Sequence, residues 1–211
     1  MPEDPRQKLL EIAGQKFAER GFDGTNVREI TEAAGMSVAS VNYYFRSKED
    51  LYIEAVRHAG LSCDLLTPFP EWGPEIPPET RLWDFIHVFL LRLLRTDTPP
   101  WHRLLIMREI AEPRPGACEA FVHSYVVPSF RILNAILAQL TPPDLPVEEI
   151  HLLGSSIVGQ ALHYHHARHV LPLLFEESPG YDIRRLTDHI WRFSLAAIRS
   201  LFPQTSEGRV L

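Results

Sequence analysis

The segment TNVREITEAAGMSVASVNYYFRSKEDL (residues 25–51) decides the fold of this chain. Its first third predicts a short helix, because Val27, Ile30 and Ala34 have the i, i+3, i+7 spacing of one buried face. Gly35 is expected to end this helix, since glycine enters the left-handed conformation of a helix C-terminus without a steric penalty. A second helix is expected to follow the glycine turn.

Small polar residues are placed where the two helices need caps. Thr25 or Asn26 can cap the first helix, and Ser37 can cap the second. On the second helix Val41 and Phe45, spaced i and i+4, are predicted to point inward. The two helices and the turn between them therefore predict a helix-turn-helix.

The other face of the second helix carries Ser40, Asn42 and Tyr43. Such a face suits a recognition helix, which enters a DNA major groove about 12 Å wide and contacts base edges. Double-stranded DNA is therefore the first expected partner. The predicted DNA contacts are Thr25, Asn26, Arg28, Ser37, Val38, Ala39, Ser40, Asn42, Tyr43 and Lys48.

Two further helices complete the predicted DNA-binding domain. The run Ser47-Lys-Glu-Asp50 fits a capping box, so a helix begins at Ser47, where free amides and Lys48 offer a positive site to a phosphate. Upstream, an apolar helical stripe that includes Phe17 stops at Gly21. The helix-turn-helix is thus expected to pack against a preceding helix.

These motifs resemble the N-terminal domain of TetR-type transcriptional regulators over about the first quarter of the chain. The matching runs are Phe17-Ala-Glu-Arg-Gly-Phe22, Thr25-x-Val-Arg-Glu-Ile30, Ala34-Gly35, Ser37 and Val41-Asn-Tyr-Tyr-Phe-Arg-Ser-Lys-Glu-Asp-Leu51. Asn42 stands where many members have tyrosine, and the turn and recognition helix lack arginine, so an arginine-to-guanine contact is not expected from them.

Shorter runs in the second half resemble the C-terminal domain of the CecR-type subgroup. They are Arg108-Glu-Ile-Ala-Glu-Pro113, Val127-Pro-Ser-Phe-Arg-Ile-Leu133 and Ser156-Ile-Val-Gly-Gln160 with Ala167-Arg168. The resemblance to TetR-type proteins implies a repressor that a small-molecule effector releases from a palindromic operator.

Net charge argues against strong bulk attraction to DNA. The whole chain carries −6, and residues 1–50 hold seven Lys or Arg against nine Asp or Glu. Salt screens charges over about 10 Å, so the charges close to the DNA matter more for binding than the net charge of the chain. Residues 25–48 hold Arg28, Arg46 and Lys48 against Glu29 and Glu32. We expect modest non-specific affinity and strong salt dependence.

Beyond residue 51 the regular patterns are helical, and no alternating strand pattern appears. Prolines and glycines separate helices expected at about 47–62, 79–95, 100–111, 117–140, 147–170 and 182–202, with a proline-rich loop at 67–78. Pro128 is expected to kink or divide the 117–140 helix. The prediction is an all-α protein with a helix-turn-helix domain at 1–50 and a helical effector-binding and dimerisation domain at 51–211.

The last two long helices carry more apolar and small residues than one core face needs, which indicates a protein partner. A two-fold dimer also lets two recognition helices read two half-sites. TetR-like proteins dimerise through their two C-terminal helices, and the resemblance implies the same here. The expected interface residues are Ser156, Gly159, His163, Trp191, Leu195 and Ile198.

Helical aromatic residues could line an effector pocket for an apolar or aromatic molecule, although an aromatic stripe on a helix more often belongs to the core. Arg108, with Glu112 one turn on, could meet a charged ligand, although an ordinary ion pair on the helix surface is favoured over this. The predicted ligand-binding residues are Trp83, Phe89, Trp101, Arg108, Phe121 and Tyr125.

Four histidines on one helix leave an alternative open. The pairs His165/His169 and His163/His166 could each meet a metal from one face. A zinc site needs a third ligand, which no nearby motif supplies, so core or interface histidines are favoured over a metal-binding sensor or enzyme built on residues 163–169. No metal or cofactor is expected.

Composition favours a compact soluble protein. The chain has 211 residues, 45% of them hydrophobic, and its two cysteines have no metal or disulfide spacing. No apolar run of the roughly 18 residues that a bilayer requires is expected, and the N-terminus does not resemble a signal peptide, so a cytoplasmic location follows. Motifs of catalysis are absent, and we expect a regulator rather than an enzyme.

Overall fold

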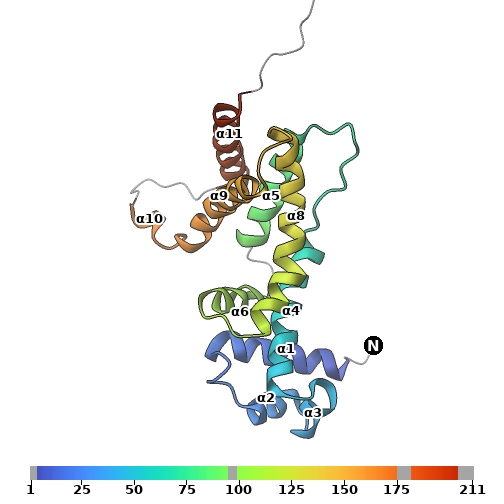
Figure 1. Ribbon diagram of the computed structural model, residues 1–211. Helices are drawn as coiled ribbons and strands as arrows, with labels where there is room; N and C mark the ends of the chain where they lie inside the picture. Colours follow the sequence, from blue (N-terminus) through green and yellow to red (C-terminus); the bar gives the residue numbers. More distant parts are fainter. Residues whose placement is uncertain (1–3, 95–98, 175–181, 204–211) are drawn as a thin grey trace, which may run out of the picture. The chain divides into compact units, whose positions relative to one another are not determined.

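The computed structural model describes residues 4–94, 99–174 and 182–203, and all regular secondary structure in these ranges is helical (Figure 1). The predicted all-α class is confirmed. The helices form two compact units. Unit 1 contains Met1–Leu66 and Thr96–Pro128, and unit 2 contains Thr67–Arg95 and Ser129–Leu211.

Unit 1 is built around the helix-turn-helix. Its helices are α1 (Pro5–Arg20), α2 (Val27–Ala34), α3 (Ala39–Phe45), α4 (Lys48–Leu66), α6 (Pro100–Ala111) and α7 (Ala117–Phe121). Helix α1 packs against α2, α4 and α6, and Phe17, Ile30 and Leu51 are fully buried in the shared core. Unit 1 therefore extends beyond residue 50. The division of the chain into a DNA-binding domain at 1–50 and an effector-binding domain at 51–211 stays a prediction.

Local signals place most of the helix ends in unit 1. Asn26 caps α2 by accepting a hydrogen bond from the amide of Arg28 at 2.9 Å, and Gly35 ends α2 with φ 70°. Ser47 precedes α4, and its hydroxyl accepts from the Asp50 amide at 3.0 Å. The cap expected from Ser37 is wrong, because α3 begins at Ala39 without a side-chain cap.

The helix expected at 117–140 is divided, as Pro128 predicted. Helix α7 passes into a π-helical turn (Val122–Val126) and then into α8 (Val127–Leu140). Proline has no amide hydrogen to donate, and its ring needs room in the preceding turn, so a widened turn directly before Pro128 is the expected response.

The same stretch corrects an expectation about apolar runs. By length and composition alone, residues 117–140 are apolar enough to cross a membrane. Core helices of soluble proteins meet the same criterion. The segment also carries Glu119 and Arg131, and the π-helical turn interrupts its α-helical hydrogen bonding.

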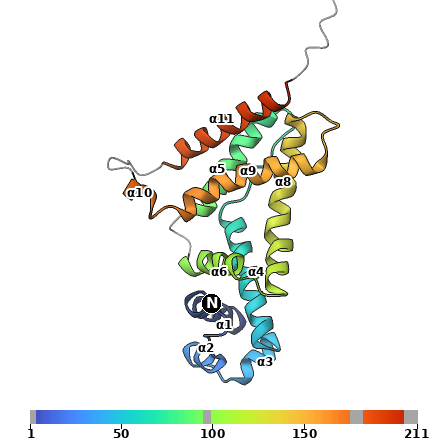
Figure 2. The same cartoon turned by 60° about the vertical axis from the view of Figure 1, so that its left-hand side comes forward.

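Unit 2 packs α5 against two long helices, as Figure 2 shows. Its helices are α5 (Pro78–Leu94), α8 (whose first two residues belong to unit 1), α9 (Val147–His166), α10 (Leu171–Leu174) and α11 (Ile183–Leu201). Phe85, Leu133 and Ile190 lie in its core. Helix α9 ends at His166, earlier than the expected 170, and the chain turns there into the short α10.

Candidate nucleic-acid interface

Helix α3 presents a solvent-facing surface held in place by two buried side chains. Val41 and Phe45 are 1% and 4% exposed, as the i, i+4 pattern predicted. Tyr43 is 82% exposed, and its ring packs edge-on against Tyr44 with the ring centres 4.8 Å apart. Asn42 is exposed beside Tyr43. The outer face of α3 is therefore free to contact another molecule.

The turn before α3 extends this face. Ser37, Val38 and Ala39 are exposed, and the amide of Ser40 donates to the Ser37 carbonyl at 3.0 Å. Arg28, on α2, is also exposed. These predicted contact residues thus lie on accessible surface of unit 1.

Thr25 is the exception, and its prediction as a DNA contact needs correction. The residue is 2% exposed, and its hydroxyl donates to the Gly21 carbonyl at 2.7 Å. A second acceptor, the Lys16 carbonyl, lies 3.1 Å away. Thr25 therefore positions the turn between α1 and α2, and its hydroxyl is not available to a phosphate.

Lys48 lies at the first turn of α4, but its side chain is not free. Its Nζ is 4.2 Å from the ring centre of Phe22, and the guanidinium carbon of Arg114 is also 4.2 Å from that ring centre. Partial burial lowers the pKa of Lys48, the Asp23 carboxylate opposes this change, and Arg114 adds to it. Two cations thus share one aromatic ring beside the helix-turn-helix.

Arg114 comes from the loop after α6, and no sequence signal linked it to Lys48. Its guanidinium pairs with Asp23 at 2.6 Å, and its amide donates to a Glu109 oxygen at 2.6 Å. The other Glu109 oxygen accepts from the Tyr52 hydroxyl at 2.7 Å. Glu109 is fully buried, and it ties the loop after α6 to α4.

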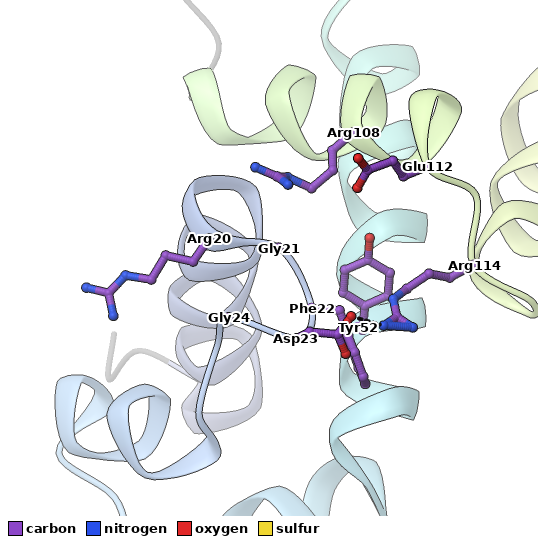
Figure 3. Close-up of a pocket in the computed structure, with 9 residues that line it drawn as sticks. All are labelled: Arg20, Gly21, Phe22, Asp23, Gly24, Tyr52, Arg108, Glu112 and Arg114. Carbon is purple, nitrogen blue, oxygen red and sulfur yellow. Dashed lines mark hydrogen bonds and ion pairs between the residues drawn. The ribbon is translucent and has the colours of Figure 1, made fainter.

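A pocket opens beside this network and includes Arg108, one of the predicted ligand-binding residues (Figure 3). We name it the turn pocket, because the turn between α1 and α2 forms one wall. Its lining residues are Arg20, Gly21, Phe22, Asp23, Gly24, Tyr52, Arg108, Glu112 and Arg114. Glu112, expected to accompany Arg108, is among them.

The other predicted ligand-binding residues do not line the turn pocket. In unit 1, Trp101 packs on Gly14, and Phe121 stacks with Tyr125 at 5.4 Å between ring centres. In unit 2, Trp83 donates a hydrogen bond to Asp188 at 2.7 Å, and Phe89 packs at the edge of the core. Their role in effector binding stays a prediction.

The predicted dimer residues on α9 are accessible, whereas those on α11 are largely not. Ser156, Gly159 and His163 are exposed. Leu195 and Ile198 are only 5% and 2% exposed, because they form part of the unit 2 core. These two interface assignments are therefore corrected.

Other residues of α9 and α11 carry the exposed apolar surface. Trp191 is half-buried, and its indole N–H donates to the Glu79 carbonyl at 2.7 Å. Phe193 is 61% exposed, and so is Leu152 on α9. Ala196 is exposed one turn after Phe193. Both helices thus expose small and apolar side chains. On α11 these are Phe193 and Ala196 rather than the predicted Leu195 and Ile198.

The four histidines at 163–169 do not share one surface. His165 is 2% exposed, and its Nδ1 lies 3.0 Å from the Leu93 carbonyl. His163, His166 and His169 are exposed. Among the described residues, no group of three or more His, Cys, Asp or Glu side chains is arranged to hold a metal ion. His165 is buried and therefore does not share an accessible face with His169.

Comparisons with known proteins agree with this architecture. The family model for bacterial regulatory proteins of the tetR family matches residues 9–55. The model for the C-terminal domain of the HTH-type transcriptional dual regulator CecR matches residues 78–198.

Similar proteins include HTH-type transcriptional regulators from several bacteria. RutR of Escherichia coli K12 is 32% identical over 107 residues, which are 50% of this chain and 48% of RutR. The repressor AcnR of Corynebacterium glutamicum is 32% identical over 101 residues, 46% of this chain and 54% of AcnR. The chain thus matches about half the length of these relatives.

Solved structures of similar fold cover nearly the whole chain. The flavonoid-responsive regulator FrrA has a TM-score of 0.65 and 23% identity, covering 92% of this chain and 96% of FrrA. AibR, solved with isovaleryl coenzyme A and operator DNA, has a TM-score of 0.62 and 19% identity, covering 95% and 99%. At these identities the likeness establishes the fold. The two family models, of which the CecR model matches residues 78–198, show that the chain belongs to the TetR family of transcriptional regulators, with a C-terminal domain of the CecR type.

Proposed function

We propose that this protein is a homodimeric, sequence-specific DNA-binding regulator whose binding to a palindromic operator is relieved by a small-molecule effector. The observation that carries the proposal is the outer face of α3, where Asn42 and Tyr43 are exposed while Val41 and Phe45 anchor the helix in the core. A helix held by its inner face and open on its outer face is what insertion into a major groove requires.

Readout by α3 rests on short polar and apolar groups, since this helix has no arginine. An asparagine amide can pair in a bidentate manner with adenine, and small apolar side chains can contact the thymine methyl. We assign the first role to Asn42 and the second to Val38 and Ala39. Ser37, Ser40 and Tyr43 would complete the contact surface around them.

Contacts to the DNA backbone would come from residues at helix ends. Arg28 lies in the first turn of α2 beside the cap residue Asn26, and Lys48 begins α4. Helix N-termini carry free amides and a partial positive charge that favour phosphate. These anchors would compensate for the acidic balance of the chain and make binding depend strongly on salt.

Dimerisation would use the exposed face of α9 and α11, including Gly159 and Phe193. A single helix-turn-helix reads few bases, whereas a two-fold dimer reads two half-sites separated by about 10 base pairs or a multiple of this. Small residues on α9 permit close approach of a second copy, and Phe193 offers apolar area to bury.

Regulation would follow from a shift between two arrangements of the dimer. An effector can relieve operator binding only to the extent that it binds the DNA-free arrangement more tightly. Repression is proposed from the family resemblance, as are action in the cytoplasm and the lack of a catalytic role. The turn pocket, with Arg108 in its wall, is one candidate place for such a ligand.

Selection of binding sites from random duplex DNA by the full-length protein tests the proposal. The expected result is an inverted repeat with two equal half-sites. Asn42→Ala should relax the preference at one base pair of each half-site by about 1–3 kcal/mol. As a control, Gln139→Ala on α8 should return the parent motif.

Absence of any enriched motif would contradict sequence-specific binding. A motif without two-fold symmetry would contradict the dimeric arrangement. If Asn42→Ala selects the parent motif unchanged, Asn42 does not read a base, and its assignment fails while the wider proposal stands.

A further inference from the structure

The turn pocket has room for a small ligand beside the helix-turn-helix. Its volume is about 210 Å³, and one water needs roughly 10–15 Å³ on a comparable measure. Gly21 has φ 74°, a conformation that side chains disfavour, and it leaves space for Arg108. A Cβ atom at Gly21 would lie only 3.2 Å from Nη1 of Arg108. The backbone of the turn thus admits the guanidinium to the pocket wall.

Two of the three arginines in the pocket already have acidic partners. Arg20 pairs with Glu29 at 2.9 Å, and Arg114 pairs with Asp23 at 2.6 Å. Within the part of the chain that the structure describes, Arg108 makes no ion pair or side-chain hydrogen bond. Figure 3 shows its side chain reaching from α6 toward the turn. A half-buried guanidinium without a partner is uncommon, because its donors need acceptors.

None of the nearby acidic residues that the structure describes forms an ion pair with Arg108. Glu112 follows one turn later on α6 but forms no pair with it, and both Glu112 and Asp23 are exposed at the rim. Solvent therefore screens their charges. Glu109 lies deeper, and both its oxygens are occupied, by the Tyr52 hydroxyl and the Arg114 amide.

Tyr52 lines the pocket, but its hydroxyl is not available to donate a hydrogen bond to a ligand. Burial raises its pKa, and the hydrogen bond to Glu109 raises it further, so the hydroxyl stays protonated. Its single proton is directed to Glu109 at 2.7 Å. The groups left to bind a ligand are therefore the Arg108 guanidinium and those donors of Arg114 that do not engage Asp23.

We propose that the turn pocket binds a small oxyanion, such as phosphate or a short carboxylate, with Arg108 as the principal donor and Arg114 as the second. A guanidinium presents a planar fork of N–H donors that matches two oxygens of a carboxylate or phosphate. Because the pocket joins the α1–α2 turn to α6, an anion in it contacts both.

Binding of inorganic phosphate and of malonate to the free full-length protein tests this inference without DNA. Each anion is titrated calorimetrically at constant ionic strength, with chloride as the balancing ion. We expect saturable binding of at least one of the two anions to the wild type. Arg108→Gln should weaken it by about ten- to hundredfold, as expected for a lost charge-assisted hydrogen bond.

Two further variants make the result specific to the pocket. Arg57→Gln removes an arginine from α4 that pairs with Glu54 on the surface, and it should bind the anion like the wild type. Arg108→Lys keeps the charge and loses the planar fork, so its affinity should lie between those of the wild type and Arg108→Gln. It also reports on the pocket if Arg108→Gln fails to fold.

Two outcomes would overturn the inference. One is no saturable binding of either anion up to about 50 mM, well beyond the millimolar range of weak sites. The other is equal loss of affinity in Arg57→Gln and Arg108→Gln, which would show attraction to general surface charge. Because these titrations contain no DNA, failure of operator binding would leave them interpretable.

Discussion

At the scale of single residues, the helix-turn-helix depends on side chains that serve the fold and the surface at once. Thr25 is buried, and its hydroxyl donates a hydrogen bond to the Gly21 carbonyl. The adjacent Asn26 caps α2 and is exposed. Lys48 packs its ammonium on the Phe22 ring, 4.2 Å from the ring centre. These interactions determine which side chains near the helix-turn-helix can contact a DNA phosphate.

Lys48→Ala tests the proposed phosphate anchor. The variant should bind all duplexes more weakly and to a similar extent. The slope of log affinity against log salt concentration should become less steep by about 1 for each DNA-contacting subunit. This is because each phosphate contact contributes about 0.9 to that slope. Fluorescence anisotropy at several salt concentrations measures this slope.

Arg131→Ala, an exposed substitution on α8, is the matched control, because it removes one positive charge from unit 2. An unchanged slope in Lys48→Ala would remove Lys48 from the backbone contacts. An equal change in both variants would assign the effect to net charge.

His102 predicts a pH dependence of stability. Burial, together with the neighbouring His58, lowers its pKa from 6.5 to about 4, although Glu11 opposes this. The unfolded chain therefore binds a proton at higher pH than the folded protein does, and stability falls as the pH drops from about 6.5 toward 4. The loss reaches at most about 3 kcal/mol from this group.

Urea denaturation at pH 7, 6, 5 and 4 measures that loss, with the wild type compared against His102→Gln. We expect the variant to lose less stability on acidification, although it starts from a lower value because the residue is buried. Parallel pH profiles for the two proteins would exclude His102 as the source.

At the scale of elements, α1 and α6 meet where a glycine faces an indole. A Cβ atom added to Gly14 would lie 2.2 Å from one ring atom of Trp101 and 2.4 Å from another. Trp101 is also surrounded by His58 and His102, so its ring has little space to move. Gly14 therefore sets how closely the two helices pack.

Gly14→Ala should destabilise the protein by about 1–3 kcal/mol, the usual range for an overpacked core, despite the better helix propensity of alanine. Gln139→Ala on α8 is the control, because Gln139 is exposed and lies on neither of the two packed helices. Its stability should stay within about 0.5 kcal/mol of that of the wild type. Equal stabilities of the two variants by denaturant unfolding would contradict the packing argument.

At the scale of the whole molecule, operator binding is proposed to depend on a second copy of the chain. The apolar and small residues on the exposed face of α9 and α11 lie in unit 2, while the recognition helix lies in unit 1. Variants in unit 2 can therefore test assembly without changing a residue of the helix-turn-helix.

Phe193→Asp should shift the protein toward monomer and weaken binding to a two-half-site operator, because it places a charge where apolar area would be buried. Sedimentation velocity measures the oligomeric state, and anisotropy measures DNA affinity. Leu104→Asp is the control, an exposed apolar residue on α6 that is 48% accessible. A dimer as stable in Phe193→Asp as in the wild type would rule out this face as the interface.

The sequence by itself determined the all-α class, the glycine turn at Gly35, the cap at Ser47, and the interrupted helix before Pro128, and it narrowed the cap of α2 to Thr25 or Asn26. These features arise from interactions within a few residues, such as caps, turn conformations and i, i+4 spacing. The family resemblance also rested on such local motifs, and it was confirmed over residues 9–55 and 78–198.

Only the tertiary structure decided which faces are buried and which distant residues meet. Leu195 and Ile198 belong to the core while Phe193 is exposed, because packing against α5 sets the rotation of α11. Arg108 and Arg114 reach a turn some ninety residues earlier in the chain, as the contact of Arg114 with Asp23 shows. Such contacts depend on long-range packing of helix faces, which periodicity marks as apolar without naming their partners.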